Sequence, residues 1–323
     1  MVKSPLAVTR DLFFFGTLRH IPLLEIVLGR SADTLDIEQG VLPDYTVQAV
    51  IDAPFPMIAR HEGAASDGIL VRGLTSVDLD KLNFYEGSFA YELIQVVLAD
   101  GQHAEIYFPQ AGRWQSDGEW SLERWVRDHG KMSRYAAREV MGYFGTRAPA
   151  DVAEMFPMIR ARAASRIRAE HSRHGSDAFH GKVRILSRSR AYAQFHALDD
   201  LELRHEHFDG SMSDVLDRAI LVAPDAAFVL PYDPVRDRVL VVEQVRIGPI
   251  GRGDRTCWHM EPIAGRIDAG ETPHAAARRE AREEASLEIG RLETIAEVYP
   301  SGGGSTEFFY LFLGLADLPD DVT

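Results

Sequence analysis

The chain has 323 residues, of which 46% are hydrophobic and 26% are charged, which is the composition of an ordinary folded protein. This length exceeds what one average hydrophobic core needs, so we expect two domains. The formal net charge is −14, from 35 Lys and Arg against 49 Asp and Glu. The acidic balance argues against general binding of nucleic acid or of anionic membranes, because no excess of cations can replace phosphate counterions.

Cys257 is the single cysteine, which excludes an intramolecular disulfide and a thiolate zinc site. A reducing cytoplasm is the expected location. No apolar run approaches the roughly 18–20 residues that a membrane span needs, so no membrane partner is expected. The short run Leu12–Phe15 ends in a glycine and indicates a buried strand.

Residues 10 to 112 have the pattern of short strands separated by Gly and Pro, with turns expected at 42–44 and 53–56. Apolar residues at three- and four-residue spacing predict one helix over Ile21–Leu28. The strands are expected over Asp11–Phe15, Tyr45–Ile51, Gly68–Leu74, Leu93–Leu98 and Ala104–Phe108.

The character changes to helical from Ser121 to His174. The Arg- and Ala-rich stretch from Arg160 to Arg173 favours a solvated helix face over a nucleic-acid arm, because acidic residues lie nearby. We therefore expect a first domain over residues 1–115, a helical connector over 116–178 and a second domain over 179–323.

Strand patterns return in the second domain, with a hairpin turn predicted by the composition of 233–237. These strands are expected over Val183–Ser187, Ala191–Leu198, Leu201–His207, Ala219–Ala223, Ala226–Tyr232, Val239–Val245 and Phe308–Leu315.

An acidic helix is predicted from Pro273 to Ala285, with Thr272 as its N-cap and Pro273 at the first helical position. Glu280, Glu283 and Glu284 share one face of it, and like charges at this spacing repel. A hard divalent cation would offset the repulsion, as would arginine pairs on a solvated face. Helical spacing alone leaves both interpretations open.

The whole segment resembles the Nudix box, in which Gly, Glu, Arg-Glu and Glu-Glu recur at fixed spacing. Ser286 stands where the box ends in Gly, at the left-handed turn after the helix. The positions that fit are Gly265, Glu271, Arg279, Glu280, Ala281, Glu283, Glu284 and Leu287.

The resemblance implies a metal-dependent hydrolase with an α/β/α sandwich. Glu280, Glu283 and Glu284 are then catalytic residues that hold Mg²⁺ or Mn²⁺, together with the backbone carbonyl of Ala264. Glu271 is expected to pair with Arg279 and brace the loop against the helix.

The surrounding motifs, among them Leu240–Arg246 and Trp258–Gly265, resemble the ADP-ribose pyrophosphatase branch, in particular its tellurite-resistance-associated members, over 183–315. In that branch, arginines at the positions of Arg246 and Arg218 bind substrate, the second from the partner subunit. The resemblance implies a small-molecule nucleoside diphosphate sugar as substrate and a homodimer that exchanges strands near 190–220. Arg246 as a surface residue and Arg218 paired with a nearby Asp are the alternatives.

Two features depart from that branch. Gly302 stands where the branch usually has Pro, although Glu307 is kept. The chain stops at Thr323, so we expect the C-terminal end of the family, with its acidic loop, to be missing.

Phe13–Arg19 is a buried strand that enters a glycine turn, and Leu79–Gly87 followed by Tyr91 is a second element. Together they resemble the gamma-glutamylcyclotransferase-like (AIG2-like) fold, a small β-barrel with helices, over residues 10–112. The catalytic Glu of that family matches Glu86, and its substrate loop matches Gly16, Thr17 and Leu18 after Phe15, which replaces the usual Tyr. Glu86 would take a proton from the α-amino group, which attacks the γ-carbonyl and releases 5-oxoproline.

We therefore expect an α+β protein of two domains whose main reaction converts ADP-ribose and water into AMP and ribose 5-phosphate. Two alternatives stay open. One is gamma-glutamyl cyclotransfer through Glu86 as the main activity, and the other is a non-catalytic sensor of a nucleotide sugar.

Overall fold

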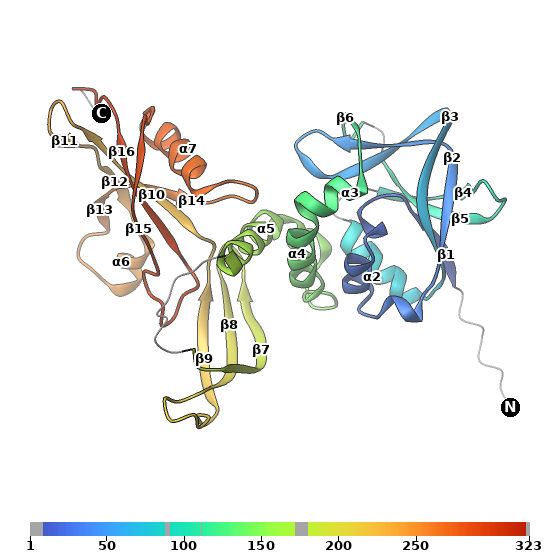
Figure 1. Cartoon of the computed structure of the whole chain (residues 1–323), viewed down its shortest axis with the longest axis horizontal. Coiled ribbons are helices and arrows are strands. Elements are labelled where there is room, and N and C mark those ends of the chain that lie inside the picture. Colours follow the sequence, from blue (N-terminus) through green and yellow to red (C-terminus); the bar gives the residue numbers. More distant parts are fainter. Residues whose placement is uncertain (1–8, 88–90, 111, 172–179, 321–323) are drawn as a thin grey trace. The chain divides into compact units, whose positions relative to one another are not determined.

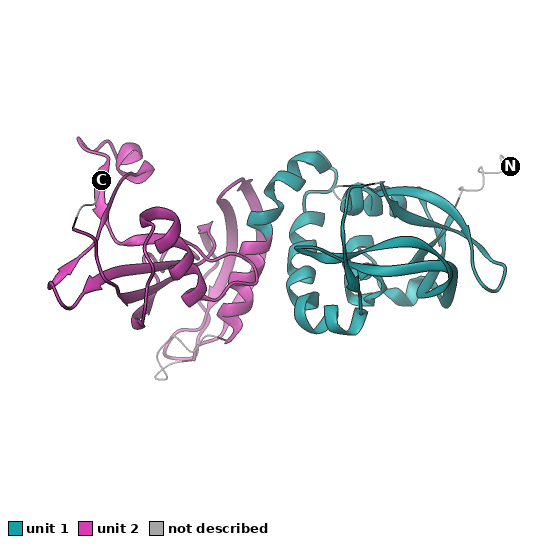
Figure 2. Ribbon diagram, turned by 90° about the horizontal axis from the view of Figure 1, so that it is seen from above, with its two compact units in different colours: residues 1–159 teal, residues 160–323 magenta. Residues whose placement is uncertain are grey.

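The computed structural model describes residues 9–87, 91–110, 112–171 and 180–320. The chain divides into two compact units, residues 1–159 and 160–323 (Figure 2). Residues 116–178, expected to form a connector, contribute to both units. Within the described residues, no helix is long and apolar enough to cross a membrane.

The first unit is built on a six-stranded sheet with the order β4-β5-β1-β3-β2-β6 (Figure 1). Strand β1 is parallel to β5, and the other neighbours are antiparallel. The strands are β1 (Arg10–Phe14), β2 (Asp36–Val50), β3 (Ala53–Leu74), β4 (Tyr91–Val97), β5 (His103–Pro109) and β6 (Ser116–Glu119).

Strand β1 separates two hydrophobic cores, because successive side chains of a strand point to opposite faces. Leu12 and Phe14 pack into the core that contains the helices, whereas Phe13 and Phe15 belong to the core on the other face. The helical elements of this unit are η1 (Thr17–Arg19), α1 (Ile21–Leu28), η2 (Ala32–Thr34), α2 (Ser76–Glu86), α3 (Leu122–Trp125), η4 (Val126–Gly130), α4 (Lys131–Met141) and the first half of α5 (Pro149–His171).

Two local expectations for these segments are wrong. The expected turn at 42–44 is a β-bulge inside β2, where Asp44 has a φ of 62° and accepts a hydrogen bond from the Gly63 N–H at 2.9 Å. The arginines of α5 do not all lie on a solvated face, since Arg162 is buried and Arg168 pairs with Asp225 at 2.6 Å.

The second unit holds a mixed sheet with the order β11-β10-β16-β15, in which β14 also pairs with β10 and β10 is parallel to β16. A hairpin β12-β13 and a three-stranded sheet β7-β8-β9 complete it (Figure 1). The elements are β7 (Val183–Ala193), β8 (Ala197–His205), β9 (Leu216–Val222), β10 (Ala226–Asp233), β11 (Arg238–Val239), β12 (Val242–Val245), α6 (Ile247–Arg252), β13 (Trp258–Glu261), β14 (Ile263–Arg266), α7 (Pro273–Ala285), β15 (Leu292–Val298) and β16 (Phe309–Leu315).

Helix α7 packs closely on β14 and β10, because its inward positions are Ala276, Ala277 and Ala281, all fully buried. The strand predicted over Ala191–Leu198 is wrong, since the chain turns there and β7 pairs with β8. The hairpin turn predicted at 233–237 is present between β10 and β11. The α+β class with two domains is confirmed.

Candidate functional site

Helix α7 begins and ends as its sequence dictates. The Thr272 hydroxyl accepts a hydrogen bond from the Ala275 N–H at 3.1 Å, and Pro273 occupies the first turn. After Ala285 the chain turns at Ser286, whose φ of 51° and ψ of 34° are left-handed values that favour glycine. The substitution of Ser for Gly therefore keeps the turn and places a Cβ in a strained conformation.

Arg279 braces the preceding loop against the helix. Its guanidinium forms a two-pronged ion pair with Glu271, with both N···O distances at 3.0 Å, and donates to the Arg266 carbonyl at 2.9 Å. The hydrogen bonds that Arg279 donates to Glu271 are the largest cause of the raised pKa of Arg279. The pairing expected from the box is present in the structure.

The three carboxylates of α7 lie in different surroundings. Glu280 is partly buried, and burial raises its pKa, with further upward contributions from the charges of Glu283 and Glu284. Arg279 donates to Glu280 at 2.6 Å and to Glu283 at 3.0 Å. Glu284 accepts from the Gln244 side chain at 3.1 Å. The face is thus a set of mutually repelling carboxylates, held together by one arginine and one amide.

Residue 265 explains how a carboxylate reaches the backbone of β14. A Cβ at Gly265 would lie 1.8 Å from Oε1 of Glu280, so only glycine leaves room for this carboxylate, one residue after Ala264. Among the described residues, no group of three His, Cys, Asp or Glu side chains is arranged to hold a metal ion. The donor set itself fits, because Mg²⁺ and Mn²⁺ prefer carboxylate and carbonyl oxygens.

The hairpin β12-β13 carries the predicted substrate arginine. Arg246 follows β12 and forms an ion pair with Glu261 at the end of β13. The hydrogen bond between Gln244 and Glu284 joins this hairpin to the acidic face of α7. The sequence does not predict the roles of Glu261 and Gln244, since a strand residue gives no signal of its partner on another element.

Arg218 lies elsewhere in the fold. It is exposed on β9 and donates to the Asp217 carbonyl at 2.8 Å, as part of the sheet β7-β8-β9. Among the described residues, Arg218 forms no hydrogen bond or ion pair with α7 or with the β12-β13 hairpin.

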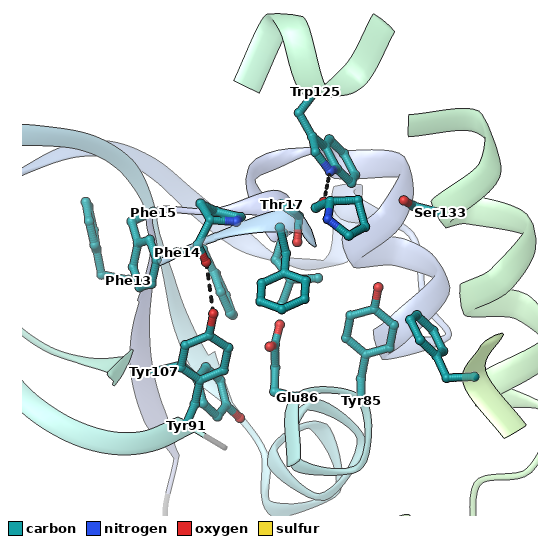
Figure 3. A pocket seen from close by; sticks show the side chains of 16 residues that line it. Phe13, Phe14, Phe15, Thr17, Tyr85, Glu86, Tyr91, Tyr107, Trp125 and Ser133 are labelled. Atoms are coloured by element: carbon teal, nitrogen blue, oxygen red, sulfur yellow. Dashed lines mark hydrogen bonds between the residues drawn. The ribbon is translucent and has the colours of Figure 1, made fainter. Parts of the chain in front are cut away.

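The first unit contains a pocket in which Gly16, Thr17, Leu18 and Glu86 meet (Figure 3). The glycine turn after β1 and the end of α2 supply these residues from two segments that are far apart in the sequence. The other lining residues are mostly aromatic: Phe13, Phe14, Phe15, Pro54, Phe55, Pro56, Tyr85, Tyr91, Tyr107, Trp125, Ser133 and Phe156.

Glu86 points into this pocket, on the side opposite Trp125 (Figure 3). Burial raises its pKa to about 8. Burial, followed by the charge of Glu86, also raises the pKa of Tyr85, Tyr91 and Tyr107. Within the described residues, Glu86 accepts no hydrogen bond, so its carboxyl group faces the pocket without a hydrogen-bond partner.

The aromatic walls are fixed by bonds to the backbone of β3. The Trp125 indole donates to the Pro54 carbonyl at 2.5 Å, and the Tyr91 hydroxyl donates to the Pro56 carbonyl at 2.9 Å. Sequence analysis missed Trp125, Ser133 and Phe156 as pocket residues. Their helical spacing indicates a packed face but does not say that this face borders a cavity.

Comparison with known families matches both units. Residues 222–323 match the family model of the NUDIX domain, and residues 12–125 match the model described as gamma-glutamyl cyclotransferase, AIG2-like.

Relatives match the second unit. The ADP-ribose pyrophosphatase of Escherichia coli is 39% identical over 135 residues, which are 42% of this chain and 64% of that protein. That of Haemophilus influenzae is 37% identical over 137 residues, covering 42% and 63%. The GDP-mannose pyrophosphatase of Yersinia pestis is 33% identical over 88 residues, covering 27% and 44%.

The chain spans less than two thirds of the length of these relatives. A solved chain titled "Crystal structure of ADP compounds hydrolase" is 19% identical with a TM-score of 0.35, covering 46% of this chain and 74% of that one. The protein therefore combines an AIG2-like gamma-glutamyl cyclotransferase domain with a NUDIX domain.

Proposed function

We propose that the NUDIX domain hydrolyses the pyrophosphate bond of ADP-ribose to AMP and ribose 5-phosphate, with Mg²⁺ or Mn²⁺ bound. The observation that carries this proposal is the link between Gln244 and Glu284, because it sets the hairpin of Arg246 beside the acidic face of α7. The names of the relatives from Escherichia coli and Haemophilus influenzae support the choice of substrate.

Glu280, Glu283, Glu284 and the Ala264 carbonyl would hold the divalent ion. A bound ion neutralises pyrophosphate oxygens and lowers the pKa of a water molecule. Arg279 fixes the positions of Glu280 and Glu283 through its hydrogen bonds. In the reaction, a P–O bond to the water oxygen forms and the bridging P–O bond breaks, while the proton of the water passes to solvent.

Arg246 is the substrate-binding residue of this account. Its planar guanidinium matches two pyrophosphate oxygens, and Glu261 holds it in place before substrate enters. Arg246→Lys keeps the charge but loses the two-pronged geometry, so KM for ADP-ribose should rise about tenfold or more with a smaller change in kcat. An unchanged KM would remove Arg246 from the site.

Arg218 is proposed to act from a second subunit of a homodimer. The sheet β7-β8-β9 supports this assembly, because its strand β7 exposes the apolar side chains of Ile185, Leu186 and Tyr192. We also propose a cytoplasmic location, because a chain with a single cysteine fits a reducing compartment. Sedimentation that returns a monomer at micromolar concentration would contradict the dimer.

A second activity is proposed for the first unit, gamma-glutamyl cyclotransfer through Glu86. The observation that favours it is the meeting of Glu86 with Gly16, Thr17 and Leu18 in one pocket.

One panel of substrates distinguishes these two activities from each other and from a sensor that binds its ligand without turnover. ADP-ribose, GDP-mannose and gamma-glutamyl compounds are incubated with the protein, and AMP, GMP and 5-oxoproline are measured by chromatography. Formation of AMP from ADP-ribose supports the main proposal. GMP as the dominant product would show that GDP-mannose, and not ADP-ribose, is the preferred substrate.

A further inference from the structure

A turn of π-helix lies next to the pocket of the first unit. The segment from α3 through η4 to α4 is one continuous helix, because the residues at both junctions have right-handed helical backbone angles. Its middle part, Val126–Gly130, is π-helical, with hydrogen bonds that span one residue more than those of an α-helix. The π-turn therefore takes up one extra residue.

The extra residue changes which side chains share a face of this helix. In a regular α-helix, residues eight positions apart point about 80° away from each other. When a π-turn between them absorbs one residue, they behave as residues seven positions apart and differ by only about 20°. Trp125 and Ser133 stand eight positions apart on either side of the turn, and both line the pocket of Glu86. The π-turn thus explains why Ser133 faces the pocket.

The Ser133 hydroxyl is available to a ligand. Serine inside a helix often donates to the carbonyl of the preceding turn, but among the described residues the Ser133 hydroxyl forms no hydrogen bond. It points into the pocket from the side of Trp125, across from Glu86 (Figure 3). Ser133 also lies beyond residues 12–125, which match the AIG2-like family model. The α4 helix therefore adds a polar group that the matched region does not contain.

The other donors of the pocket are largely occupied. Three of them already donate to oxygen atoms of the protein, namely the hydroxyls of Tyr91 and Tyr107 and the indole of Trp125. None of the described lining residues is Lys, Arg or His. Apart from Tyr85, the donors that remain are the Ser133 hydroxyl and the glycine turn with the Thr17 hydroxyl.

A gamma-glutamyl compound brings three polar groups to this pocket. Its α-amino group belongs beside Glu86, the proposed base. Its α-carboxylate meets no cation there, so it needs the N–H groups that a glycine turn presents to an anion. The γ-carbonyl oxygen is the acceptor that remains, and Ser133, across from the base, is a donor without a partner.

We propose that Ser133 is a catalytic residue of the first unit, which donates a hydrogen bond to the γ-carbonyl oxygen as the ring closes. The proposal rests on the cyclotransferase activity proposed for this pocket. The α-amino nitrogen forms a bond to the γ-carbonyl carbon, the carbonyl electron pair moves onto oxygen, and Ser133 stabilises that charge. The carbonyl re-forms as the bond to the leaving nitrogen breaks, and Glu86 passes the proton of the α-amino group to that nitrogen.

The test measures release of 5-oxoproline from gamma-glutamylanilide by the full-length protein. We expect Ser133→Ala to lower kcat about 10²-fold and to change KM less than about threefold, because the hydrogen bond strengthens as charge develops on the oxygen. Alanine favours a helix more than serine does, so this variant should fold. Lys131→Ala is the matched control, since Lys131 is exposed on the same helix. Full activity of Ser133→Ala, or an equal loss in Lys131→Ala, would overturn the assignment.

A second measurement judges Ser133 without turnover. If wild type releases no 5-oxoproline, the cyclotransferase proposal fails, and calorimetric binding of 5-oxoproline itself is compared between the same variants. This molecule carries the former γ-carbonyl as its lactam carbonyl, so Ser133→Ala should raise its Kd about fivefold or more, with no change in Lys131→Ala. In that case an unchanged Kd in Ser133→Ala, or no binding to wild type, overturns the role of Ser133.

Discussion

The two units place their carboxylates in opposite ways. In the first unit, Glu86 stands among aromatic side chains that come from segments far apart in the sequence. In the second unit, Glu280, Glu283 and Glu284 lie within five consecutive residues of one helix and contact Arg279 or Gln244. Burial alone raises the pKa of Glu86, whereas the pKa of Glu280, which burial also raises, depends in addition on Arg279, Glu283 and Glu284.

This difference corresponds to two kinds of chemistry. A lone buried carboxylate with a raised pKa can accept a proton near neutral pH, which is what a general base must do. A group of carboxylates on one face repels itself and gains stability when a divalent cation binds. The comparison therefore predicts that a change of the carboxylates in one unit lowers the activity of that unit and leaves the activity of the other unit intact.

Glu86→Gln should have the largest effect. Removal of the only proposed base should lower 5-oxoproline release by about 10²–10⁴-fold. Formation of AMP from ADP-ribose should stay at the level of wild type, since the change lies in the other unit. Both products are measured by chromatography in the same preparation. A matching loss of both activities would contradict the independence of the two units.

Arg279→Lys sharpens the comparison from the other side. Lysine cannot hold Glu271 through two parallel hydrogen bonds and also reach the Arg266 carbonyl, so the carboxylates of α7 lose their alignment. We expect hydrolysis of ADP-ribose to fall about 10–100-fold. Arg282→Lys is the control, because Arg282 pairs with the exposed Glu288. An equal loss of ADP-ribose hydrolysis in both variants would show that Arg279 has no specific role in holding the loop against the helix.

The raised pKa of Glu86 predicts how stability depends on pH. Folding raises this pKa from 4.5 to about 8, so the folded state binds a proton that the unfolded state releases. The stabilisation of the folded state by this proton on Glu86 is complete below pH 4.5, declines as pH rises and is lost above about pH 8. At one pKa unit per 1.36 kcal/mol, the loss is at most about 5 kcal/mol. Glu86→Gln should therefore become more stable than wild type as pH rises, as measured by chemical denaturation at pH 5, 7 and 9. Parallel curves at all three values would contradict the burial of Glu86.

Ser286→Gly should have the smallest effect. Glycine adopts the φ of 51° at this position without strain, which should stabilise the second unit by about 0.5–1 kcal/mol. Ser286→Ala keeps the Cβ and should bring no gain. Thermal unfolding followed by circular dichroism compares the three proteins. A gain from alanine equal to that from glycine would show that the backbone conformation is not the cause.

The sequence predicted the second site better than the first for a physical reason. Helix α7 is determined by local signals, namely Thr272, Pro273 and the spacing of its alanines and glutamates, and its predicted bounds are those of the structure. The pocket around Glu86 depends on contacts between remote segments, which no local pattern encodes. Only the resemblance to a family brought Glu86 and Gly16 together in advance.

Strand ends were the least predictable part of the fold. Proline and glycine near 42–44 and 53–56 suggested interruptions, but β2 absorbs the first in a bulge and β3 begins within the second. The hairpin between β7 and β8 was missed because Ala193 and Ala197, which pair across it, continue the apolar pattern of a strand. In these places the pairing partner decides the structure, and the local sequence does not.

The most direct test of the main proposal measures AMP formation from ADP-ribose with Mg²⁺ and with excess chelator, for wild type, Glu284→Gln and Glu288→Gln. Glu288 is an exposed carboxylate that pairs with Arg282 and lies just beyond α7. We predict AMP formation only with Mg²⁺, a loss on the order of 10²–10³-fold in Glu284→Gln and no change in Glu288→Gln. Metal-independent turnover, or full activity of Glu284→Gln, would contradict the assignment of hydrolysis to the acidic face of α7.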